Sequence, residues 1–165
     1  MKTNFTLRQA KPEDMSAVLG LIQELADFEK EPEAVIISEV DLLRDGFGVH
    51  PKFHSIVAER EGIILGMALF YSRYSTWKGP TLHLEDLIVT QSERGTGIGK
   101  ALYTAFIDFA DKQEVERIEW VVLDWNTHAV DFYKASGASV LEDWQTVQMD
   151  RNAIKLYLAK ENENI

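Results

Sequence analysis

The segment Arg94-Gly95-Thr96-Gly97-Ile98-Gly99-Lys100 could bind a phosphate group. It follows an apolar run, residues 82–89, and leads into apolar residues at helical spacing. A strand, a glycine-rich turn and a helix start present several backbone N–H groups to one point, where the helix dipole adds positive potential. Glycines also let a ligand come close to the backbone and tolerate positive φ. The segment therefore predicts a phosphate or pyrophosphate site at the start of a helix.

Two common phosphate-binding patterns do not fit this turn. The P-loop pattern needs a glycine five residues before its Gly-Lys pair and a Ser or Thr after it, where this chain has Arg94 and Ala101. The dinucleotide pattern G-x-G-x-x-G has Lys100 or Leu102 in place of its last glycine. What remains is Arg-x-x-Gly-x-Gly; a glycine-rich turn that binds no ligand is the alternative.

Two adjacent carboxylates, Glu85 and Asp86, interrupt the apolar run before the turn. Neighbours in a strand point to opposite faces, so we expect only one of them to face a substrate. A pair of solvated charges at an exposed strand end is the alternative. The apolar residues on both sides argue against it, because charged side chains are rarely placed within a buried run without a role.

Acidic side chains also gather between residues 27 and 45, opposed there by Lys30 and Arg44. They are Asp27, Glu29, Glu31, Glu33, Glu39, Asp41 and Asp45. The formal net charge of the chain is −10, which argues against a nucleic-acid partner and favours a cationic one. A solvated acidic face is the simpler interpretation for Glu31, Glu39 and Asp45.

Length and composition predict one domain, residues 1–165, with 45% hydrophobic residues to form a core. Without cysteine the chain has no disulfide, zinc-cysteine site or cysteine nucleophile, which fits a cytoplasmic location. The four histidines have no metal-ligand spacing, so we expect no metal. No apolar run is long enough for a membrane span, so we expect no membrane partner.

Periodicity, caps and turn residues predict alternating strands and helices. In the first half of the chain we expect a strand at 5–9, a helix at 12–28 and a short helix from the capping box Ser38-Glu39-Val40-Asp41 to about Gly46. Strands at 53–59 and 63–71, joined by Glu61-Gly62, a loop at 72–80 and a strand at 82–89 should follow. After the glycine turn we expect a helix, a strand at 118–122, a helix ending at Gly137, closing strands within 140–149 and a short apolar tail at 154–158.

This order, β-α-α-β-β-β-α-β-α-β, together with Arg-x-x-Gly-x-Gly, resembles the GNAT acyl-CoA N-acyltransferases over nearly the whole chain. Four segments, 41–48, 84–86, 124–126 and 132–134, resemble the diamine (spermidine/spermine) N-acetyltransferase branch, which has a near relative that acts on thialysine. The resemblance implies an α/β (α+β) fold with a mixed central sheet flanked by helices. It also implies acetyl transfer from acetyl-CoA to a primary amine of a small cationic, diamine- or polyamine-like acceptor, by direct attack in a ternary complex.

The resemblance assigns roles to residues by position. Tyr133 matches the general acid that protonates the coenzyme A thiolate, and Glu85 matches a carboxylate that contacts the substrate and can accept its proton. The pantetheine arm would bind along the backbone of Leu87, Ile88 and Val89 and at Asn126. The pyrophosphate would bind at residues 94–100. Phe28, Glu29, Glu85 and Glu142 match contacts of the amine, and a homodimer would have Trp144 near its contact.

Several alternatives stay open at this point. From sequence alone, Tyr133 is interpreted as a packing residue. Asn126 is interpreted as a helix cap, and Thr127 is the other candidate for that cap. Ser75 stands where the polyamine enzymes tend to carry an aspartate, which leaves smaller amines open as acceptors. Thialysine, an amino acid or a protein N-terminus could be the acceptor, or the protein could bind acyl-CoA without catalysis.

Overall fold

The computed structural model of the chain describes residues 4–162. The chain divides into two compact units, Met1–Val121 and Val122–Ile165. The first unit holds a five-stranded sheet and three α-helices, and the second unit holds two α-helices, within the described residues. The single domain that composition suggests stays a prediction.

The sheet of the first unit has the strand order β1-β2-β3-β4-β5. Its strands are β1 (Thr6–Gln9), β2 (His54–Arg60), β3 (Ile63–Ser75), β4 (Gly79–Val89) and β5 (Ile118–Glu119). The first four strands are antiparallel neighbours, and β5 runs parallel to β4. This is the mixed sheet that the resemblance implied.

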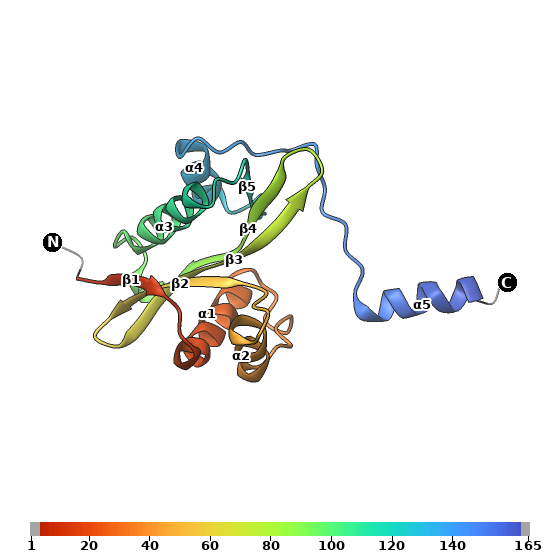
Figure 1. Cartoon of the computed structure of the whole chain (residues 1–165), viewed down its shortest axis with the longest axis horizontal. Helices are drawn as coiled ribbons and strands as arrows, with labels where there is room; N and C mark the ends of the chain where they lie inside the picture. The colour runs from red at the N-terminus through yellow and green to blue at the C-terminus, as the bar shows by residue number, and fades with distance from the viewer. Residues whose placement is uncertain (1–3, 163–165) are drawn as a thin grey trace. The chain divides into compact units, whose positions relative to one another are not determined.

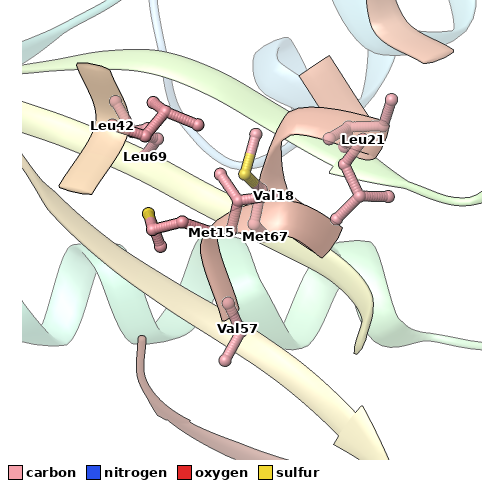
Figure 2. Packing of buried hydrophobic residues seen from close by; sticks show 8 residues of the cluster. Met15, Val18, Leu21, Leu42, Val57, Met67 and Leu69 are labelled. Atoms are coloured by element: carbon pink, nitrogen blue, oxygen red, sulfur yellow. The ribbon is translucent and has the colours of Figure 1, made fainter. Parts of the chain in front are cut away.

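Helices cover both faces of this sheet (Figure 1). Helices α1 (Met15–Phe28) and α2 (Glu39–Phe47) lie on one face, and α3 (Ile98–Lys112) lies on the other. Figure 2 shows the core beneath α1 and α2, where α1 and α2 meet the central strands through side chains that are almost fully buried. These side chains are Met15, Val18, Leu21, Leu42, Val57, Met67, Leu69 and Ile88. On the other face, Phe70 packs against Phe106 of α3, with ring centroids 5.0 Å apart.

Local sequence signals explain where several elements begin and turn. The capping box before α2 is confirmed, because Ser38 Oγ accepts from Asp41 N and Asp41 Oδ2 accepts from Ser38 N. The turn between β2 and β3 is also confirmed, with φ of 52° at Glu61 and 81° at Gly62. These positive φ values suit the twist of a two-residue hairpin. Pro12 starts a 3₁₀ turn (Pro12–Asp14) that leads into α1.

The expected loop at residues 72–80 is mostly wrong, because β3 continues to Ser75 and β4 begins at Gly79. Only a three-residue turn separates them. Ser75 Oγ accepts from the backbone N–H groups of Trp77 and Lys78, each at 3.2 Å, and so closes this turn. The polar residues here obscured the strand pattern, although strand pairing does not need apolar side chains beyond the core.

The second unit contains α4 (Thr127–Ala135) and α5 (Arg151–Asn162). Gly137 has φ of 95° after α4, as expected of a residue that ends a helix. The predicted closing strands at 140–149 are wrong, since no residue of this described segment is in a strand and all except Val140 are exposed. The predicted strand at 118–122 is shorter, because β5 stops at Glu119. A strand forms only where a neighbouring strand can pair with it, and alternating apolar residues do not by themselves provide a neighbouring strand. The apolar tail lies within α5.

Candidate active site

A β-bulge lies at Glu85, in the middle of β4. Leu84 pairs with Phe70 and Asp86 pairs with Leu69, which leaves Glu85 without a partner in β3. Residues that face each other across antiparallel strands share one face of the sheet. Asp86 therefore lies on the face of Leu69, which packs beneath α1 and α2. Leu84 lies on the opposite face with Phe70.

Glu85 lies on the same face as Asp86. Its carboxylate is 3.7 Å from Nε2 of His83, and His83 pairs with Tyr71, two residues beyond Leu69 on β3. The rings of Tyr71 and His83 lie 5.2 Å apart. The expectation that Glu85 and Asp86 point to opposite faces is thus wrong, because the extra residue of a bulge interrupts the alternation of a strand. The expectation that His83 and Glu85 share a face is confirmed.

The two carboxylates together with Glu29 form an acidic cluster, as we call Glu29, Glu85 and Asp86. Glu29 is the residue that ends α1. Burial first, and then the negative charges of Glu85 and Glu29, raise the pKa of Asp86 to about 6. Desolvation also raises the pKa of Glu29. Burial, followed by the charge of Glu85, raises the pKa of the Tyr71 phenol.

No cation of the described residues neutralises Asp86. Within residues 4–162 its carboxylate has no hydrogen-bond or ion-pair partner, and the two charges that act on it are both negative. A largely buried carboxylate without a partner is costly, because its charge has lost water and gained nothing in exchange. The arrangement is therefore suited to receive a cation from outside the chain.

Two other carboxylates of the acidic stretch, Asp41 and Asp45, are already neutralised. Arg44 Nη2 lies 2.8 Å from Asp45 Oδ2 and its Nη1 lies 2.8 Å from Asp41 Oδ1, and Lys52 Nζ lies 2.8 Å from Asp45. These pairs hold the pKa values of both aspartates below their usual range, with the hydrogen bonds from Ser38 the first cause for Asp41 and those from Arg44 for Asp45. Among the residues of this stretch, Glu29 is the one whose charge acts on Asp86.

The glycine turn leaves its backbone open. Gly95 and Gly97 have φ of 78° and 92°, a conformation that other residues adopt only with strain. Gly97 precedes the first residue of α3, and no side chain caps this helix start. A Cβ atom at Gly95 or Gly97 would meet nothing within 4 Å. The first N–H groups of α3 receive no side-chain hydrogen bond from the N-cap residue Gly97, so this helix start is suited to bind an anion, and Lys100 is exposed one turn further.

Arg94 turns from this loop toward the end of α1. Its Nε donates to the carbonyl of Val89 at 3.2 Å, its Cζ lies 5.1 Å from the centroid of the Phe28 ring, and its Nη2 is 3.9 Å from Glu24. Arg94 and Phe28, which the sequence places in two separate predicted sites, are therefore in contact. Thr96, the other polar residue of the turn, donates its hydroxyl to the carbonyl of Glu93 at 2.6 Å.

Glu24 is a residue that the sequence did not single out. Its carboxylate accepts from the backbone N–H of Gln91 at 2.6 Å and from the hydroxyl of Thr90 at 2.9 Å. It therefore ties α1 to the segment that leads into the glycine turn. Its place on the polar side of α1 gave no signal of this role, because both partners are 66 or more residues away in sequence.

One edge of β4 is open beyond the bulge. The ladder between β4 and β5 consists of Leu82–Ile118 and His83–Glu119, and it extends no further among the described residues. The opposite edge of β4 pairs with β3 as far as Val89. Leu87, Ile88 and Val89 therefore lie beyond the last described pairing of β4 with β5. The splay that a backbone-bound pantetheine arm would need stays a prediction.

The second unit carries the other predicted residues. Asn126 caps α4, with its Oδ1 accepting from Ala129 N at 3.3 Å, so Asn126 rather than Thr127 is the cap. Tyr133 lies on α4 with 9% of its surface exposed, and its ring meets that of Phe132 edge-on at 5.5 Å. Glu142 and Trp144 are exposed.

Neither a metal centre nor a membrane span appears in the part of the chain that the structure describes. No group of three or more His, Asp or Glu side chains between residues 4 and 162 could hold a metal ion. No described helix has the length and apolar character needed to cross a bilayer.

Comparison with known proteins identifies the family. The model of the acetyltransferase (GNAT) family matches residues 20–138. The chain belongs to the GNAT acetyltransferase family. It is 38% identical over 160 residues to the thialysine N-epsilon-acetyltransferase of Bos taurus, covering 90% of this chain and 94% of the relative. It is 32% identical to a spermidine/spermine N(1)-acetyltransferase-like protein 1 of Homo sapiens, covering 91% of this chain and 23% of that protein.

Solved structures agree with this fold. An integron cassette protein of V. cholerae superimposes with a TM-score of 0.77 at 25% identity, covering 96% of this chain and 99% of that chain. The GNAT fold with its mixed sheet is therefore confirmed. This chain is an acetyl-CoA-dependent N-acetyltransferase of the branch that includes the thialysine and spermidine/spermine relatives.

The open backbone suits the cofactor of this family. Acetyl-CoA carries a pyrophosphate, for which a helix start without a capping side chain is a ready site. Its pantetheine arm carries amide groups that can pair with the open edge of β4. When bound, the cofactor supplies an acetyl thioester, and the chain must then bind an amine, free it of its proton and protonate the departing sulfur.

Proposed function

We propose that the protein transfers the acetyl group of acetyl-CoA to a primary amine of a small cationic acceptor, diamine- or polyamine-like, by direct attack in a ternary complex. The observation that carries this proposal is the acidic cluster. The charges of Glu85 and Glu29 act on Asp86, and no cation of the described residues neutralises Asp86, which lies beside the part of β4 that β5 does not pair. An alkylammonium carries the missing charge and donates hydrogen bonds to carboxylates.

The proposed reaction assigns each group a separate task. Arg94 and the turn residues 95–100 bind the pyrophosphate, and the backbone of Leu87 to Val89 binds the pantetheine arm with help from Asn126. The N–H of Leu87 is a candidate donor to the oxyanion that forms during attack. Direct attack suits a chain that contains no cysteine to carry the acetyl group.

Tyr133 is the proposed general acid. A tyrosine phenol, whose reference pKa is about 10, carries a proton that it can give to a thiolate when the C–S bond breaks. The match of segment 132–134 to the branch supports this role. Its low exposure would by itself be equally consistent with packing.

The amine itself would be held by Glu29, Glu85 and Phe28, with Glu142 as a further contact. Phe28 is 37% exposed beside Arg94, so its ring is accessible to the methylene groups of an acceptor. Glu142 belongs to an exposed segment of the second unit. Its role rests on resemblance.

A thialysine-like acceptor is the second candidate. Ser75 stands where polyamine enzymes tend to carry an aspartate, and here its hydroxyl closes the turn between β3 and β4. The site then lacks one anion that a longer polycation could use. A single side-chain ammonium needs fewer anions, and the 38% identity to a thialysine acetyltransferase supports this alternative.

We also propose a cytoplasmic homodimer. Leu141, Trp144, Val147 and Met149 are all more than half exposed, and Leu156, Tyr157 and Leu158 of α5 are as well. Apolar side chains exposed in succession are typical of a surface that a second copy covers. A monomer in light scattering at micromolar concentration would contradict the dimer.

The test of the proposed function is an amine panel. Release of free thiol from acetyl-CoA is measured with spermidine, short diamines, thialysine and lysine at equal concentration. Cationic amines should be acetylated, with the short diamines and thialysine ahead of spermidine if Ser75 limits the length. A protein that binds acetyl-CoA but releases no thiol with any amine would be a binding module, and the proposal would fail.

A further inference from the structure

The bulge in β4 separates the tasks of two adjacent carboxylates. Glu85 is the extra residue, and its side chain is 53% exposed beside His83. Asp86 is paired across the ladder with Leu69, whose side chain is buried beneath α1 and α2. Both carboxylates share a face, but Glu85 is exposed and Asp86 is half-buried at the edge of the core.

We propose that Asp86 is the group that takes the proton from the bound ammonium, while Glu85 holds the cation. This inference rests on the proposed function, because it names the base of the same reaction. It differs from the role that resemblance gives Glu85, which combined substrate contact with proton acceptance.

The surroundings of Asp86 favour its protonation. Within residues 4–162 its carboxylate has neither an ion pair nor a hydrogen bond, and the charges of Glu85 and Glu29 repel its own. Accepting a proton removes a partly desolvated, unpaired charge and relieves this repulsion. Glu85, by contrast, has about half of its side chain exposed to water. Beyond them, Tyr71 and His83 lie against Glu85. Further along the same face, Arg73 forms an ion pair with Glu119, and neither charge is among those that act on Asp86.

The same surroundings bring the acidity of Asp86 closer to that of the substrate. Its pKa is raised to about 6, with burial as the first cause. An alkylammonium has a pKa of about 10.4 and an ordinary aspartate about 3.9. Proton transfer to Asp86 is therefore less unfavourable by about two orders of magnitude than transfer to an unperturbed aspartate. General bases work best when their pKa lies near the working pH.

The step balances without a further reactant. One N–H bond of the ammonium breaks, and its proton moves to the Asp86 carboxylate. The nitrogen lone pair then forms the C–N bond at the thioester carbonyl, whose oxygen becomes an oxyanion. Collapse of this intermediate restores the carbonyl and breaks the C–S bond, and the thiolate takes a proton from Tyr133. The second proton of the nitrogen restores the Tyr133 phenol, and Asp86 releases its proton to solvent.

The pH profile of kcat/KM distinguishes a base from a structural carboxylate. For the wild type, with the best amine of the panel, kcat/KM should rise through about pH 6 and then level off, because Asp86 deprotonates the bound ammonium. For Asp86→Asn, only amine that is already neutral can react. Its kcat should fall about 100-fold or more, and its kcat/KM should rise about tenfold per pH unit between pH 7 and 9.

Glu85→Gln is the matched control, since it changes the neighbouring carboxylate in the same way. Glu85→Gln should raise KM and should keep the pH-independent part of the kcat/KM profile above about pH 6. It should also move the acid limb to lower pH, because Asp86 loses a nearby negative charge that raises its pKa. Near-ultraviolet circular dichroism of all three proteins checks that they are folded.

Three results would each contradict a different part of this proposal. If the wild type is active and folded Asp86→Asn keeps its profile or a kcat within threefold, Asp86 is not the base. If Glu85→Gln instead shows the tenfold rise per pH unit, Glu85 is the base. A wild type that acetylates no amine overturns the proposed function, and this inference with it.

Discussion

The guanidinium of Arg94 lies over the ring of Phe28, with Cζ 5.1 Å from the ring centroid. Arg94 begins the glycine turn, and Phe28 precedes Glu29 at the end of α1. The proposed sites for pyrophosphate and amine therefore share a contact. A cation–π contact at such a site contributes about 0.5–1 kcal/mol, whereas a hydrogen bond to a charged group contributes about 1.5–3 kcal/mol. A bound pyrophosphate should thus draw Arg94 away from Phe28.

We therefore expect Arg94→Gln to raise the Kd for acetyl-CoA about tenfold or more, as the loss of one charge-assisted hydrogen bond would. Phe28→Leu should lower this Kd by no more than about fivefold, because it frees Arg94 without removing it. Isothermal titration calorimetry without amine measures both. Arg44→Gln is the control, since Arg44 pairs with Asp41 and Asp45 on α2. An unchanged Kd in Arg94→Gln would remove Arg94 from the cofactor site.

Gly97 supports a second prediction. Its φ of 92° makes any side chain costly, and the space in front of it is open. Gly97→Ala should lose about 1 kcal/mol of stability and weaken acetyl-CoA binding, because the methyl group enters the space proposed for the pyrophosphate. Gly62 offers a matched control, with φ of 81° and equally open space in the turn between β2 and β3. Gly62→Ala should lose similar stability but bind acetyl-CoA normally. Equal affinity in both variants would show that the turn holds no ligand.

Asp86 also predicts how stability depends on pH. Its pKa in the folded protein is about 6, above the ordinary value of 3.8, so the charged form is disfavoured by folding. This cost in folding free energy is fully present above about pH 6, decreases as the pH falls, and is absent below the unfolded-state pKa of 3.8. Two pKa units correspond to about 3 kcal/mol, which is an upper value because the buried amide of an asparagine has its own cost. Asp86→Asn should therefore melt several degrees higher than the wild type at pH 7.5, with little difference at pH 4. A lower melting temperature at pH 7.5 would mean that the carboxylate has a stabilising partner.

Tyr133→Phe tests the proposed general acid. The change keeps the ring and removes the proton, so kcat should fall at least about tenfold while the Kd for acetyl-CoA stays within twofold. Thermal melting distinguishes a loss of packing from a loss of catalysis. Phe132→Leu, on the neighbouring residue of α4, is the control for packing. Wild-type turnover in Tyr133→Phe would make Tyr133 a packing residue.

The features that the sequence predicted are those that depend on neighbouring residues. The capping box of Ser38 and Asp41, the turn at Glu61-Gly62 and the helix start after Gly97 each follow from side chains within a few positions. The orientation of Glu85 and Asp86 could not be predicted, because the bulge depends on the register of β3. The role of Glu24 depends in the same way on a distant loop.

The last prediction concerns the electrostatic contribution of Glu29 to amine binding. Glu29 adds negative charge near Asp86 and is exposed enough for salt to screen it. Glu29→Gln should raise KM for a diamine up to about fivefold at low salt, since an exposed ion pair contributes about 0.2–1 kcal/mol. The mutant's KM should also depend less on salt, and kcat should change less than KM. Glu31→Gln is the control, because Glu31 is exposed in the same stretch and its charge does not act on Asp86. If both variants raise KM equally, the whole acidic face attracts the substrate; if neither does, Glu29 is not part of the amine site.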